Sequence, residues 1–271
     1  MDPKLLADEI AAAYREHREI PTFSSRDAAF DVTMAYAVEA ELVRRRRADG
    51  RTTVGRKVGF ANKAMWRALK LETLVWAHMY DDTVRFAEHG LAALSAGRMF
   101  SPKIEPEIVF KLKRPLDSAG ADPAAVLEAV EWLALGFEVI ECVFPAWKFQ
   151  PVDFVASYGL HAALIVGDPL RVDSSMIPSL VEALPRFTVQ LKKNGGLVEE
   201  GSGKNSLRSP ALCVAELGSA IARRSGAEPL AAGELISSGS LTTSCLIGPG
   251  ERWSATVEGL DLAPLTLDVA A

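Results

Sequence analysis

The chain has 271 residues, of which 49% are hydrophobic and 24% charged, a profile typical of one large globular domain or of one domain with a small appendage. The net charge of -5 argues against a nucleic-acid-binding protein, and the one dense basic run, 44–47, is interpreted as a solvated helix face. The three cysteines are widely spaced, and no stretch is apolar enough for a signal peptide or a membrane span. We therefore expect a cytoplasmic protein.

Helical spacing of apolar residues predicts two helices near the N-terminus. The first ends before Pro21, and the second is expected over 28–47. Ser24 and Asp27 have the spacing of a capping box that would open this second helix. Because two amphipathic helices cannot bury their apolar faces alone, we expect them to pack on the rest of the chain.

The sequence pattern then changes to short predicted strands separated by turn-forming residues. Strands are expected over 54–60, 104–112, 135–144, 161–166, 186–191 and 197–200, and helices over 62–69, 123–133 and 210–224. Asn194-Gly195 predicts a hairpin turn, and Pro106 predicts that its strand lies at a sheet edge or beside a bulge. The chain is thus predicted to be a β-rich α+β protein, with a helical segment, 1–50, and a catalytic domain, 51–271.

Four common kinds of functional site are absent from the sequence. There is no Gly-x-Ser-x-Gly nucleophile elbow and no Gly-x-Gly-x-x-Gly fingerprint. The run 201–205 is unlike a phosphate loop because Asn205 stands where Ser or Thr would bind magnesium. The four histidines lack the i, i+4 pairing of a zinc helix.

Carboxylates on strands are the chemistry that the sequence does offer. Alternation places Glu105 and Glu107 on one face of a strand, with Cα atoms roughly 7 Å apart. Glu138 lies in an apolar run, where a charge is costly unless it is paired or binds a metal. Together the three suit an all-oxygen site for Mg²⁺ or Mn²⁺, although Glu-x-Glu is also typical of a solvated strand face. Lys57, bracketed by Gly55 and Gly59, is either a ligand-contacting or a surface lysine.

The order of several short motifs resembles a known family. These motifs are Gly55-x-Lys57-Val58-Gly59, Glu105-x-Glu107-Ile108-x-Phe110, Phe137-Glu138-Val139-Ile140, Asp153, and the tail segments 230–241, 250–251 and 257–260. Over about residues 50–270 the chain resembles the 2-keto-4-pentenoate hydratase and 4-oxalocrotonate decarboxylase group of the fumarylacetoacetate hydrolase superfamily. The resemblance implies a mixed β-sandwich roll, with the helical start as an N-terminal appendage.

The resemblance also implies the chemistry of the site. Glu105, Glu107 and Glu138 would hold Mg²⁺ or Mn²⁺, a 2-oxo acid would chelate the metal, and the cation would stabilise an enolate as a Lewis acid. Lys57 matches a lysine that assists this stabilisation, Asp82 falls near an acidic residue that moves protons, and Ser240 falls where a turn meets the substrate. His161 replaces a small polar residue, and is interpreted either as a general acid/base or as a core histidine.

The activity that the resemblance implies is hydration of a 2-hydroxy-2,4-dienoate. The alternatives are a decarboxylase of the 4-oxalocrotonate type and an acylpyruvate-type C–C hydrolase, for which His78 or His89 with Glu72 or Glu88 would supply a lid pair. A non-catalytic structural partner is a remoter alternative. The expected partner is a small 2-oxo acid, with no nucleic acid and no membrane, and the expected assembly is a homo-oligomer.

Overall fold

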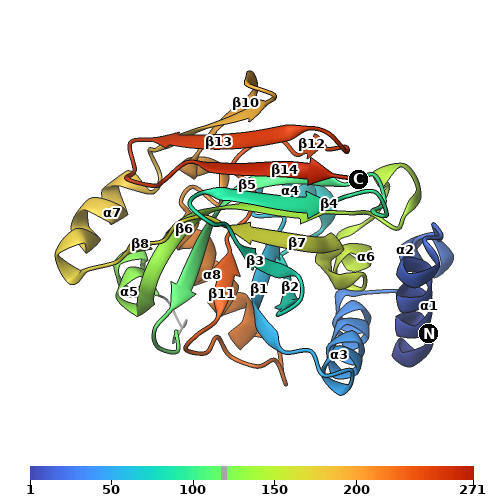
Figure 1. Cartoon of the computed structure of the whole chain (residues 1–271). Coiled ribbons are helices and arrows are strands. Elements are labelled where there is room, and N and C mark those ends of the chain that lie inside the picture. The colour runs from blue at the N-terminus through green and yellow to red at the C-terminus, as the bar shows by residue number, and fades with distance from the viewer. Residues whose placement is uncertain (117–120) are drawn as a thin grey trace.

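Two β-sheets stacked on each other, with helices around them, form the chain (Figure 1). The computed structural model describes residues 1–116 and 121–271. The larger sheet has the strand order β2-β1-β11-β5-β6-β7-β3, and β12 and β8 pair with β5 and β6. The bounds are β1 Thr53–Gly59, β2 Val75–Tyr80, β3 Val84–Phe86, β5 Lys103–Leu112, β6 Val130–Ile140, β7 His161–Val166, β8 Leu170–Arg171, β11 Leu235–Ser237 and β12 Cys245–Leu246.

The smaller sheet has the order β10-β9-β13-β14-β4. Its strands are β4 Leu91–Ser95, β9 Thr188–Lys193, β10 Gly196–Ser202, β13 Arg252–Glu258 and β14 Leu265–Ala270. In Figure 1, β13 and β14 lie across the top of the view, over the larger sheet. Parallel pairs (β1 with β11, β3 with β7, β4 with β14) occur among antiparallel ones. This confirms the expected mixed sandwich roll.

Helices cover the sheets and fill the N-terminal segment. They are α1 Pro3–Glu16, α2 Phe23–Arg26, α3 Val32–Ala48, α4 Lys63–Leu69, α5 Pro123–Ala129, α6 Pro151–Val155, α7 Ile177–Ala183 and α8 Pro210–Ala222, with short 3-10 turns η1 Pro145–Trp147, η2 Tyr158–Leu160, η3 Ser174–Met176 and η4 Gly203–Asn205. Within 1–116 and 121–271, no helix combines the length and the apolar character needed to cross a membrane. The division at residue 50 stays a prediction.

The predicted start of the second helix is wrong. The chain first forms the short helix α2, and α3 begins only after Asp31, whose side chain accepts a hydrogen bond from the Met34 N–H at 2.8 Å. Ser24 does not cap a helix, because its hydroxyl donates to Asp153 on α6 at 2.5 Å. The N-cap was misplaced because several Ser and Asp residues lie close together in this stretch.

Asp31→Ala is expected to lower the free energy of unfolding by about 1 kcal/mol, because the N-terminal N–H groups of α3 lose their side-chain acceptor. Urea titration measures the change, and Asp31→Asn should retain most of the stability. Asp27→Ala is the matched control, since Asp27 accepts from Ala29 outside α3. An equal loss in both alanine variants would contradict this assignment of the cap.

The end of the helix predicted over 123–133 and the place of the Glu-x-Glu strand also differ from prediction. Helix α5 ends at Ala129, and β6 starts at Val130, because residues from there on pair with β5 along its whole length. Strand β5 is internal, so the predicted edge position of Pro106 is wrong. The Pro106 carbonyl accepts from the Leu241 N–H, so its backbone faces the gap between β11 and β12, where no ladder hydrogen bond is lost.

Other local predictions are confirmed. Asn62 caps α4, and its side chain accepts from the Ala64 N–H at 3.0 Å. Strands β9 and β10 form the predicted hairpin, with Asn194 and Gly195 at φ values of 50° and 85°, as a primed turn requires. Pro210 opens α8 at its first helical position.

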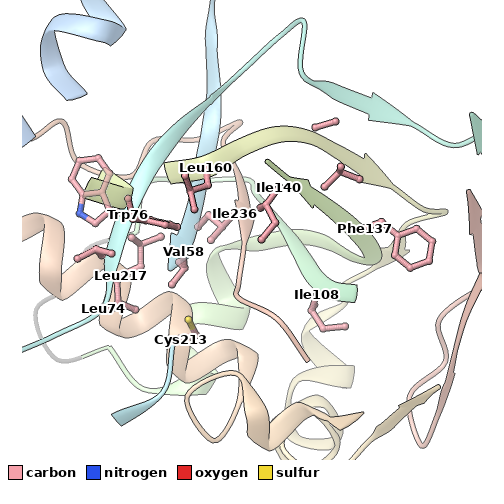
Figure 2. Close-up of a cluster of buried hydrophobic side chains, with 14 of the residues drawn as sticks. Val58, Leu74, Trp76, Ile108, Phe137, Ile140, Leu160, Cys213, Leu217 and Ile236 are labelled. Carbon is pink, nitrogen blue, oxygen red and sulfur yellow. The ribbon is translucent and has the colours of Figure 1, made fainter. Parts of the chain in front are cut away.

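Apolar side chains on one face of the larger sheet form the main core with α8 (Figure 2). Val58 of β1 and Ile236 of β11 lie near Cys213 and Leu217 of α8, and Ile108 of β5 belongs to the same cluster. The other face of the same strands carries a smaller apolar cluster that includes Val109, Ala134 and Leu164. Because side chains alternate along a strand, Glu107 and Glu138 lie on the face of this smaller cluster.

Candidate functional site

Glu105, Glu107 and Glu138 converge on one point of the larger sheet. Glu105 and Glu107 come from β5, and Glu138 lies directly opposite Glu105 on the antiparallel strand β6. One carboxylate oxygen from each residue lies within 4.8 Å of the others. Glu107 and Glu138 are fully buried, whereas Glu105 is partly exposed and lines a cavity. The predicted juxtaposition of the three carboxylates therefore occurs in the structure.

The turn that follows β11 holds Glu107 in place. Glu107 Oε2 accepts from the Ser237 hydroxyl at 2.5 Å and from the Gly239 N–H at 2.8 Å. Gly239 has a φ of +91°, which favours glycine, and a Cβ there would lie 2.8 Å from the Ala61 side chain. Glu107 Oε1 is buried and has no hydrogen-bond partner among the residues that the structure describes.

Two cationic or protonatable side chains flank Glu138. The Lys57 ammonium lies 3.0 Å from Glu138 Oε2 and also donates to the Gly159 carbonyl at 2.9 Å. His161 Nδ1 lies 2.9 Å from Glu138 Oε1. The Lys57 ammonium is further held over the Phe154 ring, 4.7 Å from its centroid. Each carboxylate oxygen of Glu138 thus lies beside a side chain that can offset its negative charge, whereas Glu107 has no such neighbour among the described residues.

Burial and neighbouring charges give the three carboxyl groups different pKa values. Burial raises the pKa of Glu105 to about 7, against the opposing effect of Lys57. Burial also raises the pKa of Glu107 well above its usual value, and the neighbouring charges of Glu138 and Glu105 add to this. Burial acts in the same direction on Glu138, but Lys57 and His161 outweigh it and lower its pKa. The protein itself therefore supplies too little positive charge to compensate three adjacent carboxylates.

A cavity of about 500 Å³ opens next to the carboxylates. Lys57, Glu105 and Ser240, all singled out from the sequence, line it. The Ser240 hydroxyl donates to the Thr242 carbonyl at 2.7 Å, so it is oriented by its own loop. The structure thus brings Lys57, Ser240 and the three carboxylates into one region.

Glycines such as those beside Lys57 can allow a ligand to approach the backbone, but here protein atoms fill both spaces. A Cβ at Gly55 would lie 1.9 Å from the Leu235 carbonyl oxygen of the parallel strand β11. A Cβ at Gly59 would lie 2.4 Å from the Phe154 ring. The two glycines allow close packing around β1, and Lys57 itself reaches the cavity.

Asp82 does not belong to this region. It lies in the turn between β2 and β3, where it forms ion pairs with Arg46 at 2.5 Å and with Arg51 at 3.3 Å. It does not line the cavity. The two arginines hold its carboxylate outside the cavity, so the proton-transfer role expected for Asp82 lacks geometric support. The prediction rested on the approximate position of an acidic residue in the resembled family.

His161 lies behind Glu138 and does not line the cavity that contains Lys57. Its Nε2 atom lies 3.0 Å from the Thr83 hydroxyl, on the wall of a second cavity of about 280 Å³. Because an ionised carboxylate only accepts, Nδ1 carries the hydrogen toward Glu138. The position of His161 favours a role in orienting Glu138 over either of the two roles expected from the sequence.

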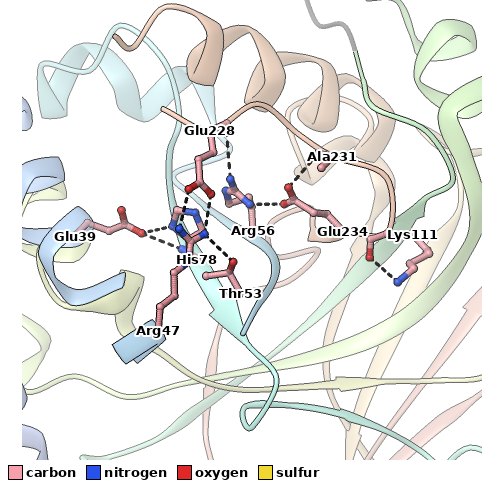
Figure 3. Close-up of polar contacts among 10 residues, drawn as sticks. Glu39, Arg47, Thr53, Arg56, His78, Lys111, Glu228, Ala231 and Glu234 are labelled. Atoms are coloured by element: carbon pink, nitrogen blue, oxygen red, sulfur yellow. Dashed lines mark hydrogen bonds and ion pairs between the residues drawn. The ribbon is translucent and has the colours of Figure 1, made fainter. Parts of the chain in front are cut away.

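A separate polar network occupies the opposite face of β1 and β2 (Figure 3). His78 Nδ1 lies 2.5 Å from Glu39 Oε1 of α3, and Arg56 forms an ion pair with Glu234. Arg47 and Glu228 add a bidentate pair at 2.7 and 2.8 Å. This network ties the N-terminal helices to the segment before β11, away from the cavity, so His78 is not part of a catalytic lid pair.

Sequence reasoning missed the groups that position the carboxylates and shape the cavity. Ser237 and Gly239 belong to a small polar run at the end of an apolar strand, which is the available signal for a turn that donates hydrogen bonds. Trp147 and Phe149 line the cavity from the loop after β6, and no local motif marks them. Thr83 is recognisable only from its contact with His161.

Comparisons with known proteins agree with this geometry. The family model described as Fumarylacetoacetate (FAA) hydrolase C-terminal matches residues 78–267. A 4-oxalocrotonate decarboxylase of Pseudomonas sp. (strain CF600) is 29% identical over 255 residues, 94% of this chain and 92% of the relative. A 2-hydroxyhexa-2,4-dienoate hydratase of Comamonas testosteroni is 27% identical over 252 residues, 92% and 90% of the two chains.

A solved structure is similar over nearly the whole chain. The 4-oxalocrotonate decarboxylase from Pseudomonas putida G7, complexed with magnesium and adipate, superposes with a TM-score of 0.87 at 27% identity. The match covers 98% of this chain and 97% of that one. The family match spans most of the chain and includes Glu105, Glu107 and Glu138. The chain therefore belongs to the fumarylacetoacetate hydrolase family.

Proposed function

We propose that this chain is a divalent-cation-dependent hydro-lyase that adds water to a 2-hydroxy-2,4-dienoate, giving a 4-hydroxy-2-oxo acid. The observation that carries the proposal is the convergence of Glu105, Glu107 and Glu138 within 4.8 Å beside a cavity. The similarity to a 2-hydroxyhexa-2,4-dienoate hydratase over almost the whole chain supports the reaction class.

The residues present fit a Mg²⁺ or Mn²⁺ ion. All three side chains offer oxygen, which both ions prefer, and Glu107 Oε1 is buried without a partner among the described residues. The magnesium of the solved decarboxylase supports the choice of a divalent cation. When bound, the cation would supply positive charge that stabilises an enolate of a 2-oxo acid.

The protein's own residues contribute charge and shape. The Lys57 ammonium reaches the cavity from a buried position, held by the Gly159 carbonyl and the Phe154 ring. It is placed to stabilise negative charge that develops on the substrate. Ile140 and Leu160 are buried side chains of the cavity wall, and they limit the access of bulk water to the reacting carbon atoms.

A carboxy-lyase of the 4-oxalocrotonate type is the second candidate, because relatives of that activity are as similar as the hydratases. Both reactions pass through the same kind of enolate. The C–C hydrolase alternative has less support, since His78 and His89 do not line the cavity. Homo-oligomeric assembly and a cytoplasmic location stay predictions from the sequence.

The test is calorimetric titration of metal-stripped protein with Mn²⁺, with and without oxalate as a stable mimic of the enolate. We expect Mn²⁺ to bind and oxalate to tighten that binding. Incubation with 2-hydroxypenta-2,4-dienoate should then consume the dienol absorbance and yield the hydrated acid. Absence of Mn²⁺ binding would remove the proposed chemistry, and release of CO₂ from 4-oxalocrotonate without hydration would favour the second candidate.

We expect Mn²⁺ affinity to fall as the pH drops below 7. The fall should be about tenfold per pH unit for every proton that the ion displaces. The reason is that Glu105 has a pKa of about 7 and Glu107 a raised pKa in the metal-free protein, so protons compete with the ion. Titrations at pH 5.5, 6.5 and 7.5 measure the slope.

The same shifts set the pH dependence of the metal-free protein's stability. A folded-state pKa above the unfolded value means that the folded state binds the proton more tightly. The contribution of Glu105 is therefore fully present below about pH 4.5 and is lost as the pH rises through about 7. Thermal melts in a chelator should show this loss in the wild type and less of it in Glu105→Gln. Identical pH profiles for the two proteins would contradict the shift.

A further inference from the structure

The charge distribution along the cavity is uneven. Lys57 and Glu105 lie at its inner end, whereas Asn62, Asn205 and Thr243 are exposed and mark its mouth. Among the described residues, Lys57 is the one cationic side chain in the wall, and Glu138 already pairs with it. Among the wall residues that the structure describes, none at the outer end carries a positive charge.

The polar side chains of the outer wall are committed to the protein's own backbone. Asn205 and Thr242 donate to backbone carbonyls at 2.7 and 3.0 Å, and the Ser240 hydroxyl does so at 2.7 Å. Asn62 accepts from a backbone N–H at the start of α4 at 3.0 Å. The Ser240 and Thr242 hydroxyls would have to give up these hydrogen bonds before they could donate to a carboxylate, and the Asn62 and Asn205 amides would offer it only uncharged donors.

Aromatic rings form the remaining wall. The ring centroids of Trp147 and Phe149 lie 6.4 Å apart, and those of Phe60 and Phe154 lie 5.4 Å apart with edge-to-face geometry. Ala146 and Trp147 both have positive φ values, 54° and 56°, which are unfavourable for residues with a Cβ. Such strain persists where the surrounding structure requires a particular placement, here that of the Trp147 ring in the cavity wall.

We propose that this cavity selects substrates with a single carboxylate and an uncharged, apolar far end, and that Trp147 determines this specificity. The inference rests on the proposed function, in which the 2-oxo acid end of the substrate lies beside Glu105 and Lys57. A second carboxylate at the far end would leave water for an aromatic wall without a cation, which is unfavourable. Monocarboxylic dienoates are accordingly favoured over dioic ones.

Lys103 is the cation that could oppose this selection. Its ammonium lies 4.0 Å from the centroid of the Trp147 ring, but Lys103 is not part of the cavity wall. The cation–π contact holds it against the ring. If Lys103 instead bound a far carboxylate, dioic acids would bind better and Lys103→Met would abolish the advantage.

The test compares two stable acids that differ only at the far end, 2-oxohexanoate and 2-oxoadipate, in calorimetric titrations of Mn²⁺-loaded protein. Oxalate, which is too short to reach the outer wall, reports on the inner end alone. We expect 2-oxohexanoate to bind at least about tenfold more tightly than 2-oxoadipate, because the far carboxylate loses its hydration. Trp147→Ala should weaken 2-oxohexanoate about tenfold and leave oxalate unchanged.

Asn205→Arg supplies the missing cation at the exposed mouth. This variant should reverse the preference in favour of 2-oxoadipate, again with oxalate unchanged. Wild-type protein that binds oxalate but takes 2-oxoadipate as tightly as 2-oxohexanoate would overturn the inference and leave the proposed function standing. Failure of oxalate to bind at all would instead overturn the proposed function itself.

Discussion

Glu107→Gln is expected to weaken Mn²⁺ binding at least about 100-fold while leaving the metal-free protein as stable as the wild type, or more stable. Substitutions around a metal that touch only supporting groups already cost 10- to 100-fold, and Glu107 would contribute both a ligand and a charge. In the metal-free protein, burial and the charges of Glu138 and Glu105 act against ionised Glu107. A neutral amide of the same shape relieves that conflict.

Glutamine also preserves the local structure. Its carbonyl oxygen can accept from Ser237 and Gly239 as Glu107 Oε2 does. Its amide nitrogen would then occupy the position of Oε1, the atom without a partner among the described residues. The loss of binding should therefore occur without unfolding, which circular dichroism can verify.

Thermal melts with and without Mn²⁺ give an independent readout. Excess Mn²⁺ should raise the melting temperature of the wild type, since an ion that binds only the folded state stabilises it by mass action, and should not raise that of Glu107→Gln. Glu141→Gln is the matched control. Glu141 is a carboxylate whose pKa is raised by burial and which accepts from the Phe100 N–H, outside the cluster. Equal Mn²⁺ affinity in Glu107→Gln and wild type would place the metal elsewhere.

Two simple rules predicted that Glu105 and Glu107 share a face and that Glu138 needs a partner, whereas the family resemblance implied that the three residues meet. Strand alternation fixes which side chains share a face, and an acidic residue in an apolar run requires a compensating partner. Neither rule depends on knowing the strand order. The register that places Glu105 opposite Glu138 was not predictable, because nothing local indicates which strands pair.

Features that depend on contacts between distant segments were wrong or missed. Pro106 suggested an edge or a bulge, but β5 is internal because it pairs with β6 on one side and with β11 and β12 on the other. Proline is tolerated there because the chain leaves the sheet between β11 and β12 at that point. Asp82 falls near the position of an acidic residue in the resembled family, but Arg46 of α3 holds it away from the cavity. The aromatic wall was missed because Trp147 and Phe149 lie in a loop, where periodicity gives no information.

Lys57→Met is expected to lower kcat/KM about 100- to 1000-fold, the range typical of removing one preorganised electrostatic contact to a transition state. Methionine keeps the length and apolar stem of lysine but removes the charge that reaches the cavity. Mn²⁺ affinity should not fall, because the ion would no longer be repelled by an ammonium 3.0 Å from Glu138. Steady-state kinetics with the dienoate and calorimetry with Mn²⁺ measure the two quantities separately.

Stability distinguishes this chemical role from a structural one. Removing one partner of a buried ion pair commonly costs about 3–5 kcal/mol, so metal-free Lys57→Met should unfold at lower urea concentration than the wild type. A bound cation would compensate Glu138, so Mn²⁺ should restore much of that stability without restoring turnover. Lys63→Met is the control, since Lys63 is exposed and its ammonium lies 5.6 Å from the centroid of the Trp66 ring, away from the carboxylates. If Mn²⁺ restored both stability and turnover to Lys57→Met, Lys57 would serve only to compensate Glu138, and the charge on the substrate would be stabilised by other groups.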